Sequence, residues 1–302
     1  MLVDKRITVS IIAREEGRTI LFLIVFASLV FAIHWFTPVS IDLPVAIAAT
    51  LGTAVAILLG FKNSSAYGRW WEARKAWGAL INNSRLFTYQ LITYMDESDD
   101  VNEKEHQATL SDLVKRHLGF VNILRDQLRD QATDESISKW LTDSDAAAIR
   151  TARNQASMLL SRQVKNLRVL CATDRFEMFR LFEPMSTIGE MTKCQGVSEG
   201  IKNTPLLLHY SWFTTAFVWL FLILLPFCFV DIGWKMIPLV VVISAVFVML
   251  DRSGTFTETP FSKNFNSVPL NAICRTTEIE LLEQIGETNL PEPLRPVDGV
   301  LM

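Results

Sequence analysis

Four long apolar segments lie in two pairs near the ends of the chain, and they flank a middle region in which acids and bases alternate every few positions. These segments cover about residues 20–36, 44–62, 206–230 and 236–251. About eighteen helical residues rise roughly 27 Å, which is close to the hydrocarbon thickness of a bilayer, about 30 Å. The sequence therefore predicts an all-α integral membrane protein with four transmembrane helices and a cytosolic helical insert at residues 64–203.

The first and fourth segments each leave an alternative open. The first resembles a signal peptide in length, but a long segment of mixed charge precedes it and no small-residue cleavage site follows. The fourth has only about fifteen apolar residues, so a crossing there needs a continuation, a tilted neighbour or a thinned bilayer. Otherwise the fourth segment is an interfacial helix.

Lysine and arginine predict the orientation, because they concentrate in cytoplasmic loops close to the span ends. They lie before the first segment, after the second and after the fourth: Lys5, Arg6, Arg14, Arg18, Lys62, Arg69, Arg74, Lys75, Arg252 and Lys263. The turn between the first two segments has none, and the link between the last two has only Lys235. We expect both termini, the insert and the C-terminal segment 252–302 in the cytoplasm.

Charge and metal-binding residue types exclude several functions. The net charge of −3 gives no footprint for nucleic acid. The cysteines form no CxxC pair and are far apart: Cys171, Cys194, Cys228 and Cys274. The histidines are scattered without metal-ligand spacing: His34, His106, His117 and His209. We expect no disulfide framework, no metal site and no cofactor.

The middle region shows apolar positions at three- and four-residue spacing, which predicts three or four long helices. Acidic, serine and threonine residues that can cap helices mark the candidate breaks: residues 98–101, 132–135, 143–145 and 173–174. Residues 251–269 predict an ordered turn or loop, and residues 270–285 a short helix. The proline-rich stretch 291–302 is expected to be extended, as a disordered tail or as a strap on a neighbouring subunit.

The second apolar segment is unusual because half of its residues are small. Small residues let helix backbones approach closely in lipid. Thr53, Ile57 and Phe61 repeat every four residues and so share one helical face. These three residues either pack in a helical core or, if several copies surround an axis, form three stacked rings with two apolar tiers that can exclude water.

Residues 51–78 resemble the signature of the bestrophin family, a glycine- and alanine-rich span that runs into an arginine-tryptophan cluster. The cluster carries the match: Arg69, Trp70, Trp71, Glu72, Ala73, Arg74 and Trp77. Residues 194–205 resemble the approach to the third span in bacterial members, through Asn203, Thr204 and Pro205. Residues 258–261 and 268–281 resemble the family's segment after the fourth span.

This resemblance implies one bestrophin-like channel domain over residues 1–302, assembled as a pentamer around a central pore. By position it implies a hydrophobic neck at Thr53, Ile57 and Phe61. An exit aperture on the cytosolic side is expected near Cys194, with Met191 and Gln195 as alternatives.

Two departures from the family pattern change these expectations. Thr53 stands where the relatives often have a bulky aliphatic residue, so that tier should be wider and wetter. Animal bestrophins clasp calcium with an acidic run after the fourth span, where this chain has Glu258 as the one acid. Calcium prefers several oxygen ligands that include carboxylates, so we expect no calcium gating.

The sequence thus predicts a passive ion channel of the bacterial inner membrane, with the bilayer, permeant ions and further copies of itself as partners. The resemblance implies chloride and similar anions, with monovalent cations, as in some bacterial relatives, as the alternative. A membrane-anchored helical scaffold without flux is the alternative from another class. An enzyme is not expected, because the apolar runs hold neither acid nor lysine.

Overall fold

The computed structural model describes residues 9–38, 42–95, 103–173, 175–176, 178–204, 208–264 and 266–296. These residues are predominantly helical and form no β-sheet; an isolated antiparallel bridge joins Met95 and Phe176. The elements are α1 (Val9–Phe36), α2 (Val45–Tyr94), α3 (Glu103–Leu128), α4 (Asp134–Trp140), α5 (Asp143–Arg150), α6 (Gln155–Ala172), η1 (Met178–Leu181), α7 (Phe182–Asn203), α8 (Leu208–Phe229), η2 (Val230–Lys235), α9 (Met236–Glu258) and α10 (Leu270–Gln284).

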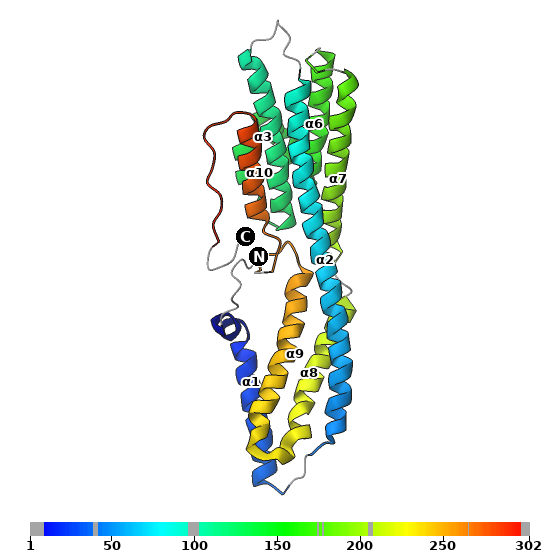
Figure 1. Ribbon diagram of the computed structural model, residues 1–302, viewed down its shortest axis with the longest axis vertical. Helices are drawn as coiled ribbons and strands as arrows, with labels where there is room; N and C mark the ends of the chain where they lie inside the picture. The colour runs from blue at the N-terminus through cyan, green and yellow to red at the C-terminus, as the bar shows by residue number, and fades with distance from the viewer. Residues whose placement is uncertain are drawn as a thin grey trace. The chain divides into compact units, whose positions relative to one another are not determined.

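The chain folds into two compact units, which we name by their composition. The apolar unit comprises residues 2–70 and 205–260, and the charged unit comprises residues 71–204 and 261–302. Helix α2 is continuous and contributes to both (Figure 1).

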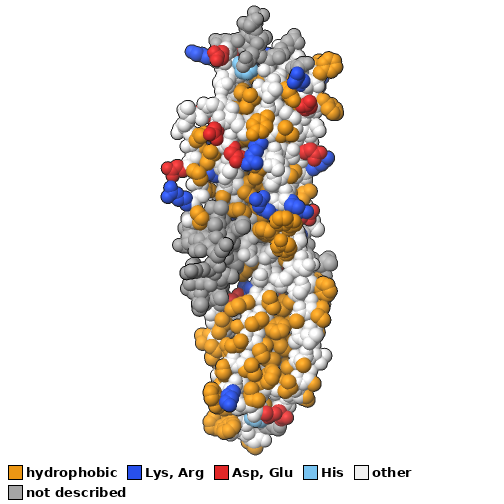
Figure 2. All heavy atoms as spheres, in the orientation of Figure 1, with side chains coloured by type: hydrophobic (Ala, Val, Ile, Leu, Met, Phe, Trp, Pro, Cys, Tyr) orange, Lys and Arg blue, Asp and Glu red, His pale blue; other side chains and the backbone are white. Residues whose placement is uncertain are grey.

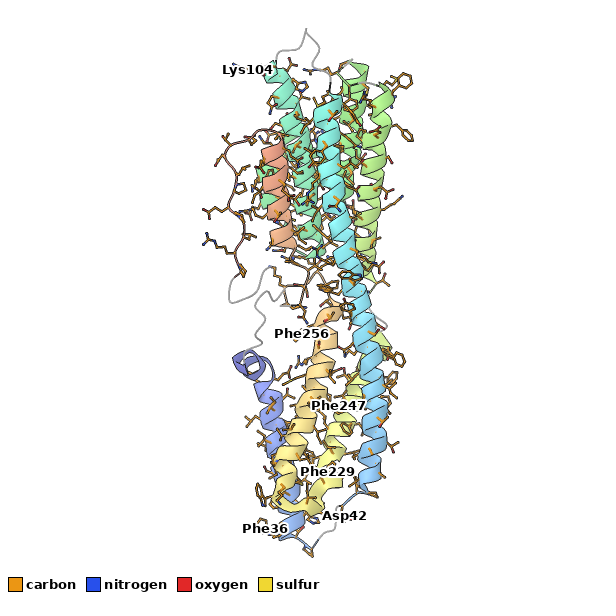
Figure 3. The ribbon with its side chains drawn as sticks, in the orientation of Figure 1. Phe36, Asp42, Lys104, Phe229, Phe247 and Phe256 are labelled. Carbon is orange, nitrogen blue, oxygen red and sulfur yellow. The ribbon has the colours of Figure 1, made fainter. Side chains whose placement is uncertain are left out.

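Helices α1, α8 and α9 of the apolar unit pack side by side around an apolar core (Figure 1). Phe229 of α8 and Phe247 of α9 pack against this core (Figure 3). Large apolar side chains also cover the visible outer surface of these helices (Figure 2). On α1, Leu21 and Phe22 are exposed. A helix that is apolar on both its inner and its outer face is typical of a helix that spans a lipid bilayer.

Three stretches of the described chain are long and apolar enough to cross a membrane: Glu16–Phe36, Val45–Tyr94 and Tyr210–Glu258. The third contains both α8 and α9, which are separated by η2. Gly233 in η2 has φ of 69°, a left-handed conformation that glycine adopts without a steric penalty. The chain therefore breaks its helix here, and α8 and α9 pack against each other.

In the charged unit, α3 packs against α4, α6, α7 and α10. Leu118 and Ile123 of α3 and Trp77 and Phe87 of α2 are fully buried. Buried ion pairs add to this apolar core, such as the pair of Arg116 and Asp145 at 2.6 Å.

Most predicted helices are confirmed, with one error. Helices α8 and α10 agree with the prediction to within a few residues, and chain breaks occur at the predicted residues 132–135 and 173–174. Helix α5 begins at Asp143, so the third predicted break is confirmed. The predicted break at 98–101 lies outside the described residues.

The error concerns residues 251–258, which we predicted as a loop and which continue α9 as helix. Their serine and threonine content misled the prediction, because Thr255 and Thr257 bond the carbonyls one turn back and so fit a helix.

The C-terminal stretch is extended as predicted as far as residue 296. Arg275 Nη1 donates to the Glu292 carbonyl at 3.0 Å, so the described part contacts α10 of its own unit. The strap on a neighbouring subunit stays a prediction.

Candidate functional site

The face of α2 that points away from the apolar core carries the predicted neck residues. Ile57 is 55% exposed and Phe61 is 63% exposed, and Thr53 is exposed as well. Val55 and Leu59, on the other side of the helix, are buried in the core. The structure thus brings the three predicted residues onto one exposed stripe and removes them from the packing of the subunit.

The rest of that exposed face is lined by small residues, which include Ala49, Ala56 and Gly60. Helix α1 differs, because its exposed face carries large residues such as Leu21 and Leu29. Lipid chains favour large apolar side chains, whereas small ones let a second helix approach closely. The exposed face of α2 therefore matches a helix partner better than it matches lipid.

The Thr53 hydroxyl donates a hydrogen bond to the carbonyl of Ala49, one turn back along α2, at 2.8 Å. Its one proton is used inside the helix, so its free lone pair can only accept hydrogen bonds or contact a cation. The first position of the stripe, Thr53, is thus polar, but its hydroxyl has no hydrogen-bond donor left to offer.

A buried ion pair lies directly after the stripe, and sequence reasoning missed it. Lys62 was interpreted as a flanking cytoplasmic charge, but its side chain is 0% exposed and its Nζ lies 2.7 Å from Oδ1 of Asp251. Thr215 and Thr255 complete the pair with hydroxyls 3.4 and 3.0 Å from Nζ. No sequence signal joins residues 189 positions apart, so only the fold reveals this contact.

The arginine-tryptophan cluster behaves as an anchor. Arg69 Nε donates to the carbonyl of Glu258, the last residue of α9, at 2.9 Å. Trp70 stacks on Tyr67 with ring centroids 6.2 Å apart. Ala73 and Trp77 are fully buried. The remaining side chains of the predicted signature are partly or fully exposed: Trp71, Glu72, Arg74 and Asn203. Pro205 lies outside the described residues.

The residues predicted for the exit aperture lie inside the charged unit. Met191, Cys194 and Gln195 are all buried. The Gln195 amide donates to Ser157 and Glu199, both at 2.7 Å, and burial raises the pKa of the Cys194 thiol. A side chain that lines a channel between subunits is exposed in the single subunit, so this burial gives the aperture prediction no support. The aperture stays a prediction.

An exposed apolar cluster at the start of α7 is a second feature that the sequence did not single out. It comprises Met178, Phe179 and Phe182, and Phe179 is 91% exposed. Large apolar residues gathered on a charged unit are typical of contact surfaces or constrictions. A signal existed in the sequence, namely aromatic residues next to the predicted break at 173–174.

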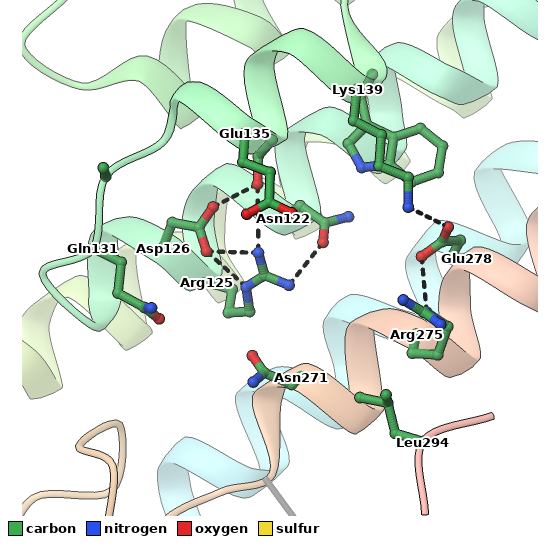
Figure 4. Close-up of a pocket in the computed structure, with 13 residues that line it drawn as sticks. Asn122, Arg125, Asp126, Gln131, Glu135, Lys139, Asn271, Arg275, Glu278 and Leu294 are labelled. Atoms are coloured by element: carbon green, nitrogen blue, oxygen red, sulfur yellow. Dashed lines mark hydrogen bonds and ion pairs between the residues drawn. The ribbon is translucent and has the colours of Figure 1, made fainter. Parts of the chain in front are cut away.

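A polar pocket of about 320 Å³ lies between α3, α4 and α10 of the charged unit (Figure 4). Its cations have ion-pair partners: Arg125 pairs with Asp126 at 2.6 Å, while Lys139 and Arg275 share the carboxylate of Glu278 at 2.6 and 3.2 Å. The pair of Lys139 and Glu278 joins α4 to α10. Among the described residues no group of three His, Cys, Asp or Glu side chains could hold a metal ion.

Comparisons with known proteins add an independent finding. A family model described as bacterial/fungal bestrophin protein matches residues 4–283. The voltage-dependent anion channel-forming protein YneE of Escherichia coli K12 is 28% identical over 288 residues, which are 95% of this chain and 92% of that protein. The voltage-dependent anion channel-forming protein RSc3414 of Ralstonia nicotianae is 26% identical, with 90% and 87% covered. A bacterial bestrophin homologue from Klebsiella pneumoniae superposes with a TM-score of 0.81 at 26% identity, with 89% of this chain and 97% of that chain covered.

Proposed function

Because the chain belongs to the bacterial and fungal bestrophin family, we propose that it is the subunit of a passive ion channel that conducts chloride and similar small anions. The names of relatives that align over nine-tenths of the chain, anion channel-forming proteins, support both the activity and the sign of the ion. A channel needs no catalytic residues, and an enzyme is not part of the proposal.

The observation that carries this proposal is the exposed stripe Thr53, Ile57 and Phe61 on the face of α2 that small residues line. If copies of α2 surround an axis, the small residues allow the helices to approach and the stripe becomes stacked rings. Two apolar rings would form the hydrophobic neck, which conducts only while it is wide enough to hold water.

The proposed assembly is a ring of five subunits in the bacterial inner membrane, in which residues 1–302 act as one channel domain. Four crossings, by α1, α2, α8 and α9, leave both termini in the cytoplasm. The lysines and arginines that flank these helices support that orientation.

A second constriction on the cytosolic side remains a proposal at Cys194, Met191 or Gln195. The exposed cluster Met178, Phe179 and Phe182 is the rival position, favoured by its exposure. Alanine at Phe179 should change conductance if the cluster is the constriction, whereas alanine at Cys194, or at the alternatives Met191 and Gln195, should do so if the aperture lies where the sequence predicts it.

Purified protein in liposomes tests the function directly. A reversal potential measured in planar bilayers under a KCl gradient gives the sign of the permeant ion in one reading. A potential near that of chloride supports the proposal, and one near that of potassium overturns the anion assignment. If neither assay detects flux, the channel proposal is wrong and the alternative function, a membrane-anchored helical scaffold, is favoured.

A monovalent-cation channel is the second candidate, and one observation favours it. The Thr53 hydroxyl gives its proton to Ala49 and so presents only an oxygen acceptor, which suits a cation better than an anion. Replacing Thr53 with valine removes that oxygen at similar volume. A cation channel should lose selectivity in this variant, while an anion channel should not.

The neck assignment is tested by alanine at Ile57 or Phe61, which should each raise single-channel conductance by widening an apolar ring. Leu29 is a matched control, because it is an exposed large apolar residue on α1. Leu29→Ala should leave conductance unchanged. Equal currents in wild type and both neck variants would refute the assignment.

Calcium gating is not part of the proposal, because Glu258 is the one acid in residues 257–269, the stretch that corresponds to the acidic run of animal bestrophins. Adding micromolar calcium to the bilayer should leave the current unchanged. Activation in that range would show that carboxylates from elsewhere complete a site.

A further inference from the structure

The ion pair between Lys62 and Asp251 occupies the interior of the apolar unit, where an isolated charge is costly. The ammonium of Lys62 has three protons, and three oxygens lie around it: Asp251 Oδ1 at 2.7 Å, Thr255 Oγ1 at 3.0 Å and Thr215 Oγ1 at 3.4 Å. The Thr215 hydroxyl in turn lies 3.2 Å from both oxygens of the Asp251 carboxylate. The cluster is thus satisfied internally, and it joins α2, α8 and α9.

Lys62 is the residue that directly follows Phe61 in α2. Successive helical residues are rotated by about 100°, so the two side chains leave the helix on different sides. Lys62 points into the bundle and is fully buried, whereas Phe61 is largely exposed. A rotation of α2 that moved Phe61 would also move the Lys62 ammonium away from the three oxygens that surround it.

Neighbouring contacts hold α2 against α9 at the same level. Asn63 Nδ2 donates to the carbonyl of Leu250 at 3.0 Å. Opposite these residues α9 has Gly254, where a Cβ would lie 3.3 Å from Asn63 Oδ1 and 3.4 Å from Lys62 Cγ. A Cβ at this position would make the Asn63 and Lys62 side chains yield by a few tenths of an ångström, so glycine eases the contact between α9 and α2 at the level where Asp251 meets Lys62.

A second ion pair follows in sequence. Arg252 Nε lies 3.2 Å from Glu16 Oε1, so α9 also holds α1. Asp251 and Arg252 together tie α9 to two other helices of the unit, and Thr215 adds a third. We use the name polar collar for six residues: Glu16, Lys62, Thr215, Asp251, Arg252 and Thr255.

We propose that Lys62 and Asp251 are positioning residues for the neck: their buried ion pair fixes the rotation of α2 and thereby the exposure of Ile57 and Phe61 on the stripe. This inference rests on the proposed channel function for its effect on current, but the orientation of α2 can be measured without any flux. Neither residue contacts the permeating ion in this proposal.

The test uses the full-length protein in liposomes and follows a cysteine placed at Ile57. The rate at which a water-soluble methanethiosulfonate reagent modifies Ile57→Cys is read by mass spectrometry, and single-channel conductance is read in parallel in proteins without the cysteine. The four native cysteines are buried, which keeps the background low. Lys62→Met removes the charge at similar length, Asp251→Asn removes the other, and the double variant removes both. Lys62→Arg restores a cation.

We expect Lys62→Met and Asp251→Asn each to change the modification rate by about threefold or more, with a matching change in conductance. The double variant should change little further, because both single variants break the same contact. Lys62→Arg should return both readouts toward wild type, which a general loss of packing would not do. The control Lys193→Met breaks an exposed pair with Glu190 and should change neither readout.

Unchanged modification rates and conductance in folded variants would overturn the proposal. If a single variant fails to fold, the double variant carries the test, because it leaves no lone buried charge. A changed modification rate in a protein that conducts no ions would support the positioning role and reject the proposed channel function. The two claims therefore fail separately.

Discussion

The two units of this chain place their side chains in opposite ways. The apolar unit exposes large apolar residues, and its polar collar holds the buried pair of Lys62 and Asp251 and a second pair between Glu16 and the half-exposed Arg252. The charged unit exposes its charges and buries several ionic clusters, as around Asp145 and Glu278. The difference shows that burial of apolar surface alone cannot stabilise the first unit in lipid, since its outside is as apolar as its inside.

Because of this difference, we expect the two units to respond differently to substitutions and to pH. The charged unit is stabilised by water exclusion, so its core should respond strongly to buried charge, pH and volume. The apolar unit depends on close helix packing and on the polar collar. A change in its core volume should therefore lower the free energy of unfolding less where a neighbouring aromatic side chain can move. The four predictions below test this ordering, from the largest expected effect to the smallest.

The largest effect is expected at Asp145 of the charged unit. Its buried carboxylate accepts hydrogen bonds from Arg116, at 2.6 Å, and from Arg162. Asp145→Asn leaves these two guanidiniums without their anion and should cost about 3–5 kcal/mol, measured as a lower midpoint of thermal or denaturant unfolding. Glu190→Gln, at an exposed pair, should cost at most about 1 kcal/mol. Equal losses in the two variants would contradict this account.

Acid should destabilise the charged unit next most strongly, through His117. Burial lowers the pKa of His117 to about 4, from 6.5, and neither ring nitrogen has a hydrogen-bond partner among the described residues. The unfolded chain therefore binds a proton between pH 6.5 and 4 that the folded chain excludes, and stability falls as pH falls through that range, by about 2 kcal/mol at pH 5.

The measurement compares unfolding midpoints of wild type and His117→Leu at pH 7 and pH 5. Leucine cannot titrate, so the variant should lose less stability on acidification, although it lacks the ring contacts with Phe87 and Phe120. Titration of Asp145 does not contribute to the loss of stability between pH 7 and pH 5. Burial would raise its pKa, but the hydrogen bonds and charges of Arg116 and Arg162 outweigh burial and lower it, so its stabilisation is lost only at more acidic pH. Parallel pH profiles would show that His117 is not responsible.

Sequence reasoning predicted the features that depend on local pattern. Apolar length located α1, α2, α8 and α9, and the four-residue repeat placed Ile57 and Phe61 on one helical face, which is exposed in the structure. It misjudged features that depend on distant partners. Lys62 resembles a flanking charge until the fold brings Asp251 to it.

The buried aperture candidates show the same limit. Met191 and Gln195 lie on α7, and periodicity cannot tell which face of a helix the other elements cover when polar and apolar residues mix on both. The Gln195 amide donates to Glu199, one turn further along α7, which the four-residue spacing allows, and to Ser157 of α6, a contact that no pattern in α7 encodes.

A glycine in the charged unit gives the third effect. A Cβ on Gly119 would lie 2.7 Å from Leu141 Cδ2 and 3.3 Å from Trp140 Cβ, so the Leu141 side chain must move and the end of α4 must yield by a few tenths of an ångström. Gly119→Ala should lower stability by about 1–3 kcal/mol despite alanine's better helix propensity. Gly196→Ala is the matched control, because a Cβ there meets open space, and it should be neutral or stabilising. A stabilised Gly119→Ala would mean that α4 moves freely.

The same substitution in the apolar unit should give the smallest effect. A Cβ on Gly52 would lie 3.2 and 3.3 Å from Cε2 and Cζ of Phe221, the far edge of a ring that can yield by a few tenths of an ångström. We expect Gly52→Ala to change stability by less than about 1 kcal/mol, since the gain in helix propensity offsets the displaced ring. Unfolding midpoints of Gly52→Ala and Gly119→Ala measured in the same detergent decide the matter. A loss at Gly52 as large as that at Gly119 would show that the apolar unit is packed as tightly as the charged one, and that the collar is not its main constraint on α2.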